Sequence, residues 1–270
     1  MVGRGVVMGN VSIVISVAPL YYAFLLSTST ATDIAQNPIP SLIPQGRLLE
    51  NIGRVISSDI NFWPALWNSI LSSGLIALSV VFFSTLAGWA FAKLRFRGSS
   101  WLLVFVIATM AVPTQLGVVP LYILFSDLGW TGQLGAIIVP ALVSAFGVFW
   151  MTQYLRQAVP DELIEAARVD GASSFRTFLT VGLPAARPAA AMLALFTFVS
   201  AWNNFFWPFI VLGSSNPTLP VALQLLQASY FKDLSLIMAG VVLATVPLLL
   251  LFVVAGRQLV SGIMQGAVKG

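Results

Sequence analysis

Six long apolar runs, separated by polar segments, dominate the pattern of the chain. None of them contains Asp, Glu, Lys or Arg, and each is long enough for a helix to cross a hydrocarbon core of about 30 Å. Because backbone polar groups inside lipid must bond to one another, we expect every run to be a transmembrane helix. The expected spans are Val6 to Leu26, Ile70 to Ala92, Trp101 to Leu124, Leu134 to Tyr154, Pro188 to Leu212 and Leu234 to Ala255.

The basic residues predict which side of the membrane each connecting segment faces. With a cytoplasmic N-terminus, ten of the 13 Lys and Arg residues lie inside, which is the positive-inside bias of membrane proteins. Both termini are then cytoplasmic. A cleaved signal peptide is an alternative for the first run, although such peptides have apolar stretches of only about 7 to 15 residues. The inner residues are Arg4, Lys93, Arg95, Arg97, Arg156, Arg168, Arg176, Arg187, Arg257 and Lys269, and the outer ones are Arg47, Arg54 and Lys232.

Composition agrees with the membrane interpretation. The 270 residues are 58% apolar and 8% charged, whereas soluble domains have about 25% charged residues. We therefore expect one all-α transmembrane domain over residues 1–270. The chain has no Cys and no His, which excludes disulfides and the usual zinc sites, and we expect no metal site. Its net charge of +4 is spread over separate loops, so nucleic acid is not an expected partner.

Two connecting segments are long enough to hold structure of their own. The external segment, residues 27–69, contains apolar turns that predict a short surface helix around Leu48 to Ile56. The inner segment, residues 155–187, begins with Pro160 and two acids, which favour a helix start. Gly171 is suited to end that helix in a left-handed cap, and a second short helix is expected to run to about Gly182.

Small side chains give the inner segment a surface that another protein can approach closely. Ala166 and Ala167 lie about one turn before Gly171, so little bulk stands between the helix backbone and a neighbour. This pattern suits a docking surface. An amphipathic helix that only connects two spans at the membrane surface fits the same pattern.

A resemblance to a known family favours docking. The spacing Glu165-Ala-Ala, three residues, Gly171, nine residues, Val181, one residue, Leu183-Pro184 resembles the EAA loop of ABC importer permeases, with Val181 in place of isoleucine. Segments 94–98, 40–44 and 202–208, together with Asn51, are similar to the carbohydrate branch of that family. In the family this loop is a coupling helix that sits in a cleft of the ATPase subunit. The resemblance assigns that role to Glu165, Ala166, Ala167, Asp170 and Gly171.

The same resemblance implies the architecture and the partners. It implies a type I ABC importer permease with six spans in a bacterial cytoplasmic membrane, importing a di- or oligosaccharide or a related glycoside by alternating access. The implied partners are a homologous second permease subunit, two copies of a cytoplasmic ATPase subunit and an extracytoplasmic solute-binding protein. ATP and Mg²⁺ would be bound by the ATPase subunits, and no cofactor or catalytic residue is expected in this chain.

The residues themselves leave the energy source partly open. Lys93, Lys232 and Lys269 are the only lysines, and none lies in a P-loop motif. The spans contain no Asp, Glu, His, Lys or Arg, which argues against proton coupling but leaves sodium coupling open. The alternatives are therefore an importer permease for a glycerophosphodiester, peptide or polyamine, or an ion-coupled secondary carrier.

Polar and aromatic residues within the spans are candidates for contact with a neutral sugar, which needs amide or hydroxyl partners and an aromatic face. Hydrogen bonds between helices and anchoring at the membrane interface are the alternative roles for the same side chains. Four prolines, at positions 113, 120, 140 and 247, could kink the helices that contain them. The candidate substrate residues are Gln115, Trp150, Thr197, Trp202, Asn203 and Asn204.

Overall fold

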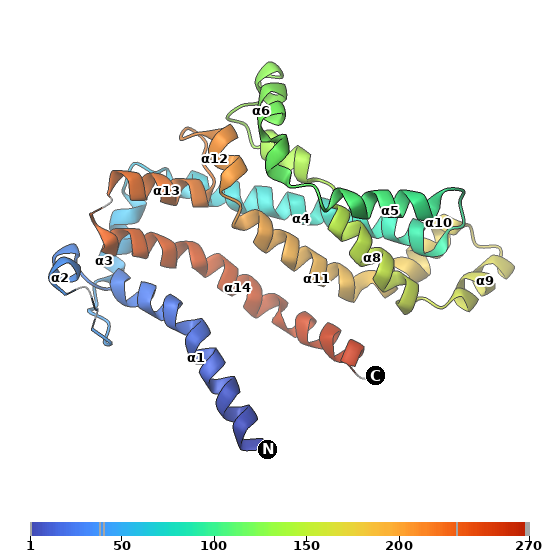
Figure 1. Ribbon diagram of the computed structural model, residues 1–270, viewed down its shortest axis with the longest axis horizontal. Coiled ribbons are helices and arrows are strands. Elements are labelled where there is room, and N and C mark those ends of the chain that lie inside the picture. Colours follow the sequence, from blue (N-terminus) through green and yellow to red (C-terminus); the bar gives the residue numbers. More distant parts are fainter. Residues whose placement is uncertain (1, 38, 40, 231, 268–270) are drawn as a thin grey trace. The chain divides into compact units, whose positions relative to one another are not determined.

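The computed structural model describes the backbone of residues 2–37, 39, 41–230 and 232–267, and the side chains of residues 15–254 with the same internal gaps. Every regular element in these ranges is a helix, and no strand occurs among them (Figure 1). The chain divides into two compact units. Unit one holds residues 1–67 and 217–250, and unit two holds residues 68–216 and 251–270.

The helices follow one another along the chain with short connections. α4 and α14 each belong partly to both units. The elements are α1 Val2–Ser27, α2 Ala31–Gln36, α3 Leu48–Ile56, α4 Phe62–Lys93, α5 Ser99–Thr109, η1 Thr114–Gly117, α6 Val118–Asp127, α7 Gly135–Ile138, η2 Val139–Ala141, α8 Ala145–Ala158, α9 Asp161–Val169, α10 Ser174–Thr177, η3 Phe178–Gly182, α11 Leu183–Trp202, α12 Phe206–Leu212, α13 Leu219–Ser229 and α14 Leu234–Ala267.

Four of the expected spans are helices long and apolar enough to cross a membrane, and a fifth is added if one bent pair counts as a single span. The four are Phe62–Lys93, Gly135–Ala158, Ser174–Trp202 and Leu234–Val254. The first expected span lies on α1, but the side chains of residues 1–14 fall outside the described part. Its described portion, Ile15–Ser27, is apolar but short, so this span stays a prediction.

The third expected span, Trp101 to Leu124, is not one straight helix. α5 ends at Thr109, and the chain resumes as η1 and α6 after a bend of 85° (Figure 1). Pro113 stands directly before η1. Its ring would clash with the carbonyl of Thr109 in a continuous helix, and it also disfavours the helical conformation at Val112. The proline therefore sets the position of this break.

The fifth expected span, Pro188 to Leu212, is wrong at both ends. Its helix begins at Ser174, passes through a π turn at η3 and ends at Trp202. A separate helix, α12, follows after Asn203, Asn204 and Phe205. Pro208 explains the second break, because a continuous helix would drive its ring into the carbonyl of Asn204. The short helix expected to end near Gly182 instead continues into α11.

The external segment contains the surface helix that its pattern predicts, since α3 spans Leu48–Ile56. Two further helices were not predicted, α2 in the same segment and α13 between the last two expected spans. α2 begins with a capping box formed by Thr30 and Asp33. α13 is apolar but only 11 residues long, so a search for membrane-length runs passes over it.

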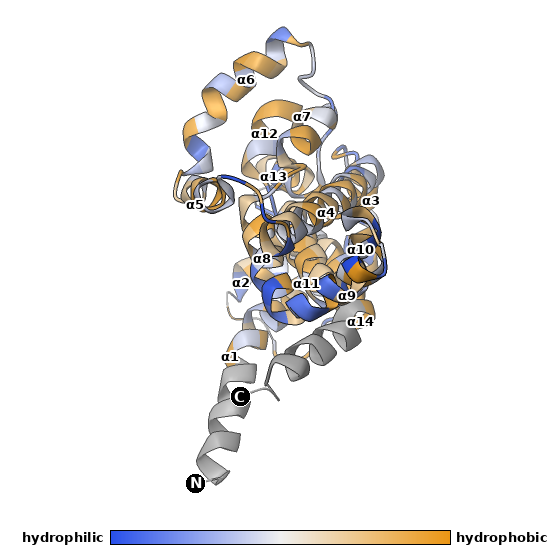
Figure 2. Ribbon diagram, turned by 90° about the vertical axis from the view of Figure 1, so that its right-hand side faces the viewer, coloured by the Kyte–Doolittle hydropathy of each residue, from blue (hydrophilic) through white to orange (hydrophobic). Residues whose placement is uncertain are grey.

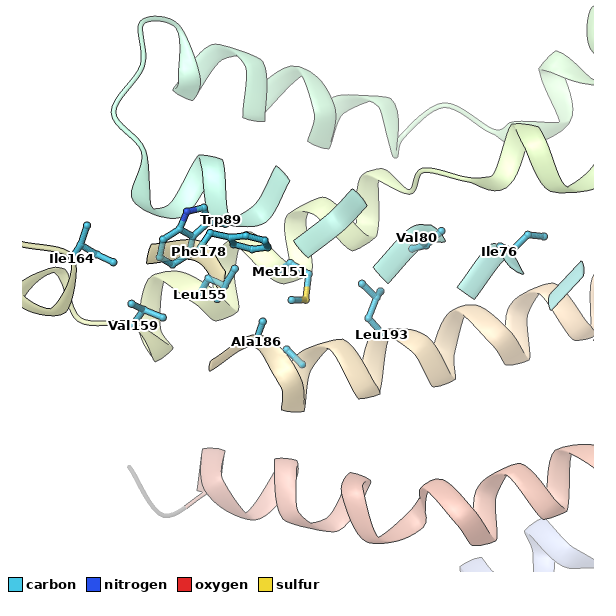
Figure 3. Packing of buried hydrophobic residues seen from close by; sticks show 11 residues of the cluster. Ile76, Val80, Trp89, Met151, Leu155, Val159, Ile164, Phe178, Ala186 and Leu193 are labelled. Atoms are coloured by element: carbon cyan, nitrogen blue, oxygen red, sulfur yellow. The ribbon is translucent and has the colours of Figure 1, made fainter. Parts of the chain in front are cut away.

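The larger core of unit two lies where α4, α8 and α11 pack together. Val80 on α4, Met151 and Leu155 on α8 and Leu193 on α11 are almost completely buried in one cluster (Figure 3). A second cluster joins α6, α7 and α12 through Phe125, Ile137 and Val211. Side-chain packing thus fixes α12 against α6 and α7 rather than in line with α11.

Asn51 joins two segments of unit one. Its side chain is 3% exposed, and its amide nitrogen donates to the carbonyl oxygens of Ser27 at 2.9 Å and Ser29 at 3.0 Å. These carbonyls belong to the end of α1, where helical partners run out. Arg54 donates in turn to the Asn51 side-chain oxygen at 3.1 Å. Asn51 therefore caps α1 from α3.

Asp233 extends this network to α14. Arg54 donates to one of its carboxylate oxygens, while the other accepts from the backbone N–H of Leu236 and the hydroxyl of Ser235. Partial burial by itself raises the pKa of Asp233, but the hydrogen bonds from Ser235, Arg54 and Leu236 lower it by more, so the carboxyl group has a pKa below its ordinary value. The start of α14 is thereby capped by an ionised side chain.

Replacing Asn51 is expected to destabilise the fold strongly. Asn51→Leu leaves two carbonyls and part of a guanidinium without their partner, so we expect the free energy of unfolding to fall by about 2 to 4 kcal/mol. Thermal unfolding of the purified chain in detergent measures this. Glu50→Gln is the matched control, because its pair with Arg47 is more than half exposed and contributes little. Equal unfolding temperatures for the two variants would contradict the capping role.

Candidate docking loop and solute pathway

We call residues 155–187 the docking loop. Its first helix, α9, starts at Asp161 directly after Pro160, whose extended backbone supplies the turn into the helix. Asp161 and Glu162 lie at the positive end of the helix dipole and Arg168 at the negative end, and both placements are favourable. The helix predicted from sequence at this point is therefore confirmed.

Gly171 ends α9 in the predicted left-handed conformation, with φ +75°. The N–H of Ala172 donates to the carbonyl of Ala167 at 2.9 Å, and that of Gly171 donates to Arg168 at 3.0 Å. These two bonds form a Schellman motif, which requires positive φ at its glycine. Ser173 then starts α10 by accepting from the N–H of Arg176. The turn between the helices is thus fully specified by local chemistry.

One side of α9 faces the core and the rest is accessible. Ile164 is buried with Val159 and Phe178 in the larger cluster. Glu165, Ala166, Asp170 and Gly171 are exposed, and Ala167 is half-buried. Figure 2 shows hydrophilic positions gathered around α9 and α10, whereas α4 and α5 are largely hydrophobic. The five residues assigned from the family resemblance therefore lie on one short helix and its cap.

Two exposed apolar side chains near this cap were not among the predicted docking residues. Val169 is 88% exposed and Phe175 is 66% exposed, one on each side of Gly171. Large apolar groups exposed beside a polar helix commonly mark a contact surface. Both residues are visible in the sequence as apolar positions that flank the predicted turn, whereas the docking surface was predicted from the small residues and the family resemblance alone. We add Val169 and Phe175 to the candidate docking surface.

An ion pair joins the start of α9 to the end of α4. The ammonium of Lys93 donates to a carboxylate oxygen of Asp161 at 2.8 Å. This hydrogen bond, together with the positive charges of Lys93 and Arg95, lowers the pKa of Asp161 below its ordinary value. The carboxylate therefore stays ionised at neutral pH and keeps its charge-assisted contact.

Two of the six candidate substrate residues are occupied by packing within the chain. Trp150 donates its indole N–H to the carbonyl of Ala189 at 3.2 Å, which ties α8 to α11. Trp202 is 3% exposed and stacks on Phe198 with ring centroids 5.7 Å apart. In this structure both tryptophans take part in helix packing, a role different from the interfacial anchoring considered for them.

The other candidates lie at or near the helix breaks. Asn203 and Asn204 are exposed between α11 and α12, although the Asn203 amide also donates to Val199 of its own helix. Gln115 is exposed on η1, next to the other break, and Thr197 is half-buried on α11. Interrupted membrane helices expose backbone and amide groups that can bind solutes. Gln115, Asn203 and Asn204 thus present exposed side-chain amides at the two breaks.

The described residues combine features that are suited to contact with a partner or a solute. Among the residues described with side chains, no three acidic residues lie close enough together to hold a metal ion. What the described chain offers is a set of apolar helices, exposed amides at the bend before η1 and at the end of α11, and a capped polar loop. Such an arrangement can bind a partner and transmit its movement.

Comparison with known proteins gives one family and several relatives. The family described as binding-protein-dependent transport system inner membrane component matches residues 81–260, a range that contains the docking loop and both helix breaks. The arabinooligosaccharides transport system permease protein of Halalkalibacterium halodurans is 31% identical over 258 residues, covering 95% of this chain and 92% of that protein.

Two further relatives are named for other solutes. The lactose transport system permease protein of Rhizobium radiobacter is 29% identical, and the sn-glycerol-3-phosphate transport system permease protein of Brucella abortus is 28% identical. Each alignment covers 94% of this chain and 92% of the relative. Among solved structures, a chain from a bacterial ABC transporter involved in the import of the acidic polysaccharide alginate has a TM-score of 0.77, with 94% of both chains covered. At 22% identity, this last likeness concerns the fold alone.

Proposed function

Because the chain belongs to the family of binding-protein-dependent transport system inner membrane components, we propose that it is the membrane-spanning permease subunit of an ATP-driven sugar importer. The family match over residues 81–260 carries the proposal. Proteins of this family are transport subunits and not enzymes. ATP and Mg²⁺ would be bound by two copies of a cytoplasmic ATPase subunit, a homologous permease subunit would complete the pathway, and a solute-binding protein would deliver the solute.

Relatives named for arabinooligosaccharides and lactose support a di- or oligosaccharide as the solute. The relative named for sn-glycerol-3-phosphate makes a phosphorylated polyol the second candidate. A phosphate group normally calls for Arg or Lys at its binding site, and neither occurs in residues 98–155 or 188–231, which contain the two helix breaks. The exposed amides of Gln115, Asn203 and Asn204 suit the hydroxyl groups of a neutral sugar better.

The proposed topology has six spans and cytoplasmic termini, as the distribution of basic residues predicts. It places the docking loop on the cytoplasmic side of a bacterial plasma membrane. Single cysteines introduced into this cysteine-free chain should react with an impermeant thiol reagent from outside at Ser41 and Ser215. At Ser100 and Ser174 they should react only after the cells are opened. Labelling of position 174 in sealed cells would show that the docking loop faces outward and would contradict the proposed topology. All four positions are exposed or near the surface of the described chain.

The docking loop is proposed to receive the movement of the ATPase subunits. Its exposed residues Glu165, Ala166, Asp170 and Gly171, with half-buried Ala167, would sit in the ATPase cleft, with Val169 and Phe175 supplying apolar contacts. When the ATPase subunits close on ATP, this contact would bias the helix bundle from inward-facing to outward-facing. The bend between α5 and α6 and the break after Trp202 are the interrupted segments along which a solute would pass.

ATP hydrolysis by the purified complex tests the proposed coupling. The chain by itself should bind no ATP specifically, because none of its lysines lies in a P-loop motif. The complex with both ATPase copies should hydrolyse ATP faster when solute-loaded binding protein is added. An ATP hydrolysis rate that does not change when loaded binding protein is added would count against the role as an ATP-driven importer subunit and would favour the ion-coupled carrier.

A further inference from the structure

The last turn of α4 contacts the docking loop at both of its ends. At the entrance, Lys93 is paired with Asp161, the first residue of α9. At the exit, the ring of Trp89 lies against Gly182, the last residue of the π turn η3, and its centroid is 5.8 Å from that of Phe178. Figure 3 shows Trp89 and Phe178 side by side within the larger cluster.

At the entrance contact, Lys93 and Asp161 are buried to very different extents. The Lys93 side chain is 4% exposed, whereas that of Asp161 is 74% exposed. The lysine side chain is therefore almost completely covered by the chain, whereas the carboxylate it contacts is open to solvent. A buried ammonium depends strongly on its partner, whereas Asp161 could be solvated by water. The pair consequently restrains α9 more than a surface ion pair of the same length would.

The exit contact depends on shape. A Cβ atom on Gly182 would lie 2.6 Å from the six-membered ring of Trp89, so only glycine lets the ring lie this close. Trp89 is 4% exposed, and its indole N–H has no hydrogen-bond acceptor among the described residues. The ring is therefore held by packing against the π turn. π turns insert an extra residue into a helix and often occur at functional sites.

We propose that Lys93 and Trp89 are positioning residues of the transport cycle, which hold the docking loop at its entrance and exit so that its displacement moves α4. This inference rests on the docking role proposed above. Without the two contacts, the ATPase could move α9 while the loop yields, and ATP would be hydrolysed without transport. α4 is itself packed on α8 and α11 through Val80, Met151 and Leu193, so movement of α4 would reach the helices beside the breaks.

The amount of solute taken up per ATP hydrolysed is the quantity that tests the entrance contact. In assembled complexes in proteoliposomes, Asp161→Asn should lower this ratio about five- to tenfold, because it removes a charge-assisted bond to a largely buried lysine. Asp161→Glu should retain most of the ratio, since the exposed site has room for a longer carboxylate. Glu162→Gln, one residue along α9, is the control and should change nothing. If Glu162→Gln lowered the ratio as much as Asp161→Asn does, the loss of one negative charge would explain the effect and the contact with Lys93 would not be responsible.

Trp89→Phe tests the exit contact. It removes ring atoms that face Gly182 but keeps an apolar ring, so assembly should be normal and the ratio should fall about twofold, as expected for a small loss of packing. An unchanged ratio would remove Trp89 from the proposal.

A covalent tether gives the sharpest test. Lys93→Cys with Asp161→Cys should lower the ratio as Asp161→Asn does, and a flexible bis-maleimide joining the two cysteines should restore it, because the two segments move together. If the tether blocks uptake, α9 must move relative to α4 and the proposal is wrong.

Gly171→Val distinguishes failure of the role proposed for α4 from failure of the docking role. If it blocks uptake while the Asp161 and Trp89 variants leave the ratio unchanged, only the role of α4 fails. If it also has no effect, the docking role fails as well.

Discussion

Gly171→Val is expected to abolish solute uptake while the chain reaches the membrane at near-normal abundance. Gly171 adopts φ +75°, and a Cβ atom there would meet nothing within 4 Å in the chain itself. The substitution therefore creates no internal clash. It imposes backbone strain of about 1 to 3 kcal/mol, confined to a turn outside the packed helices, and it places branched bulk on the docking surface.

Gly98→Val is the matched control for this substitution. Gly98 has φ +84° and equally open surroundings, and it lies on the same predicted side of the membrane but outside the docking loop. Both variants carry the same kind of strain, so only loss of the docking surface separates them. Uptake should disappear with Gly171→Val and persist with Gly98→Val. If both variants transport normally, the turn is a passive connector. If both lose uptake equally, strain alone is the cause.

Gly88→Ala is expected to destabilise the whole of unit two. An added Cβ would lie 2.6 Å from the Cβ of Met151 and 2.9 Å from the backbone of Met151 and Thr152, residues that are completely buried. Because backbone cannot yield locally, α4 and α8 would have to move apart. We expect a cost of about 3 kcal/mol from overpacking, with reduced membrane abundance and a lower unfolding temperature.

Gly74→Ala is the control on the same helix, since a Cβ there would meet nothing within 4 Å. The same exchange should be neutral or should stabilise α4 by up to about 1 kcal/mol through helix propensity. Equal behaviour of the two variants would mean that α4 and α8 do not approach as closely as the structure places them. The close approach of α4 and α8 at Gly88 is an example of the small-residue packing that is common between membrane helices.

The sequence predicts those parts of the fold that short-range signals determine. α9 and its cap follow from Pro160, the acids after it and Gly171, all of which act on backbone a few residues away. α3 follows from its apolar periodicity. The apolar runs predict where membrane-length helices lie, because hydrophobicity over about 20 residues is sufficient for a span.

Tertiary packing and helix breaks were harder to predict. Freedom from charge does not distinguish a straight helix from a bent one. Pro113 was named as a possible kink, but the 85° bend there was not predicted, and the end of α11 at Trp202, which Pro208 marks, was missed. Gly182 was expected to end a helix, but it has helical φ of −64°, and glycine is needed there because Trp89 leaves no room for a Cβ. The partner of Trp150 lies 39 residues away, beyond any local pattern.

Uptake of radiolabelled oligosaccharide into proteoliposomes tests the central claim most directly. The complete complex should accumulate solute only when ATP is present on the side of the docking loop and loaded binding protein on the opposite side. The chain reconstituted without ATPase subunits should accumulate none, whatever ion gradient is imposed. Accumulation by the chain alone, driven by a sodium or proton gradient, would contradict the account.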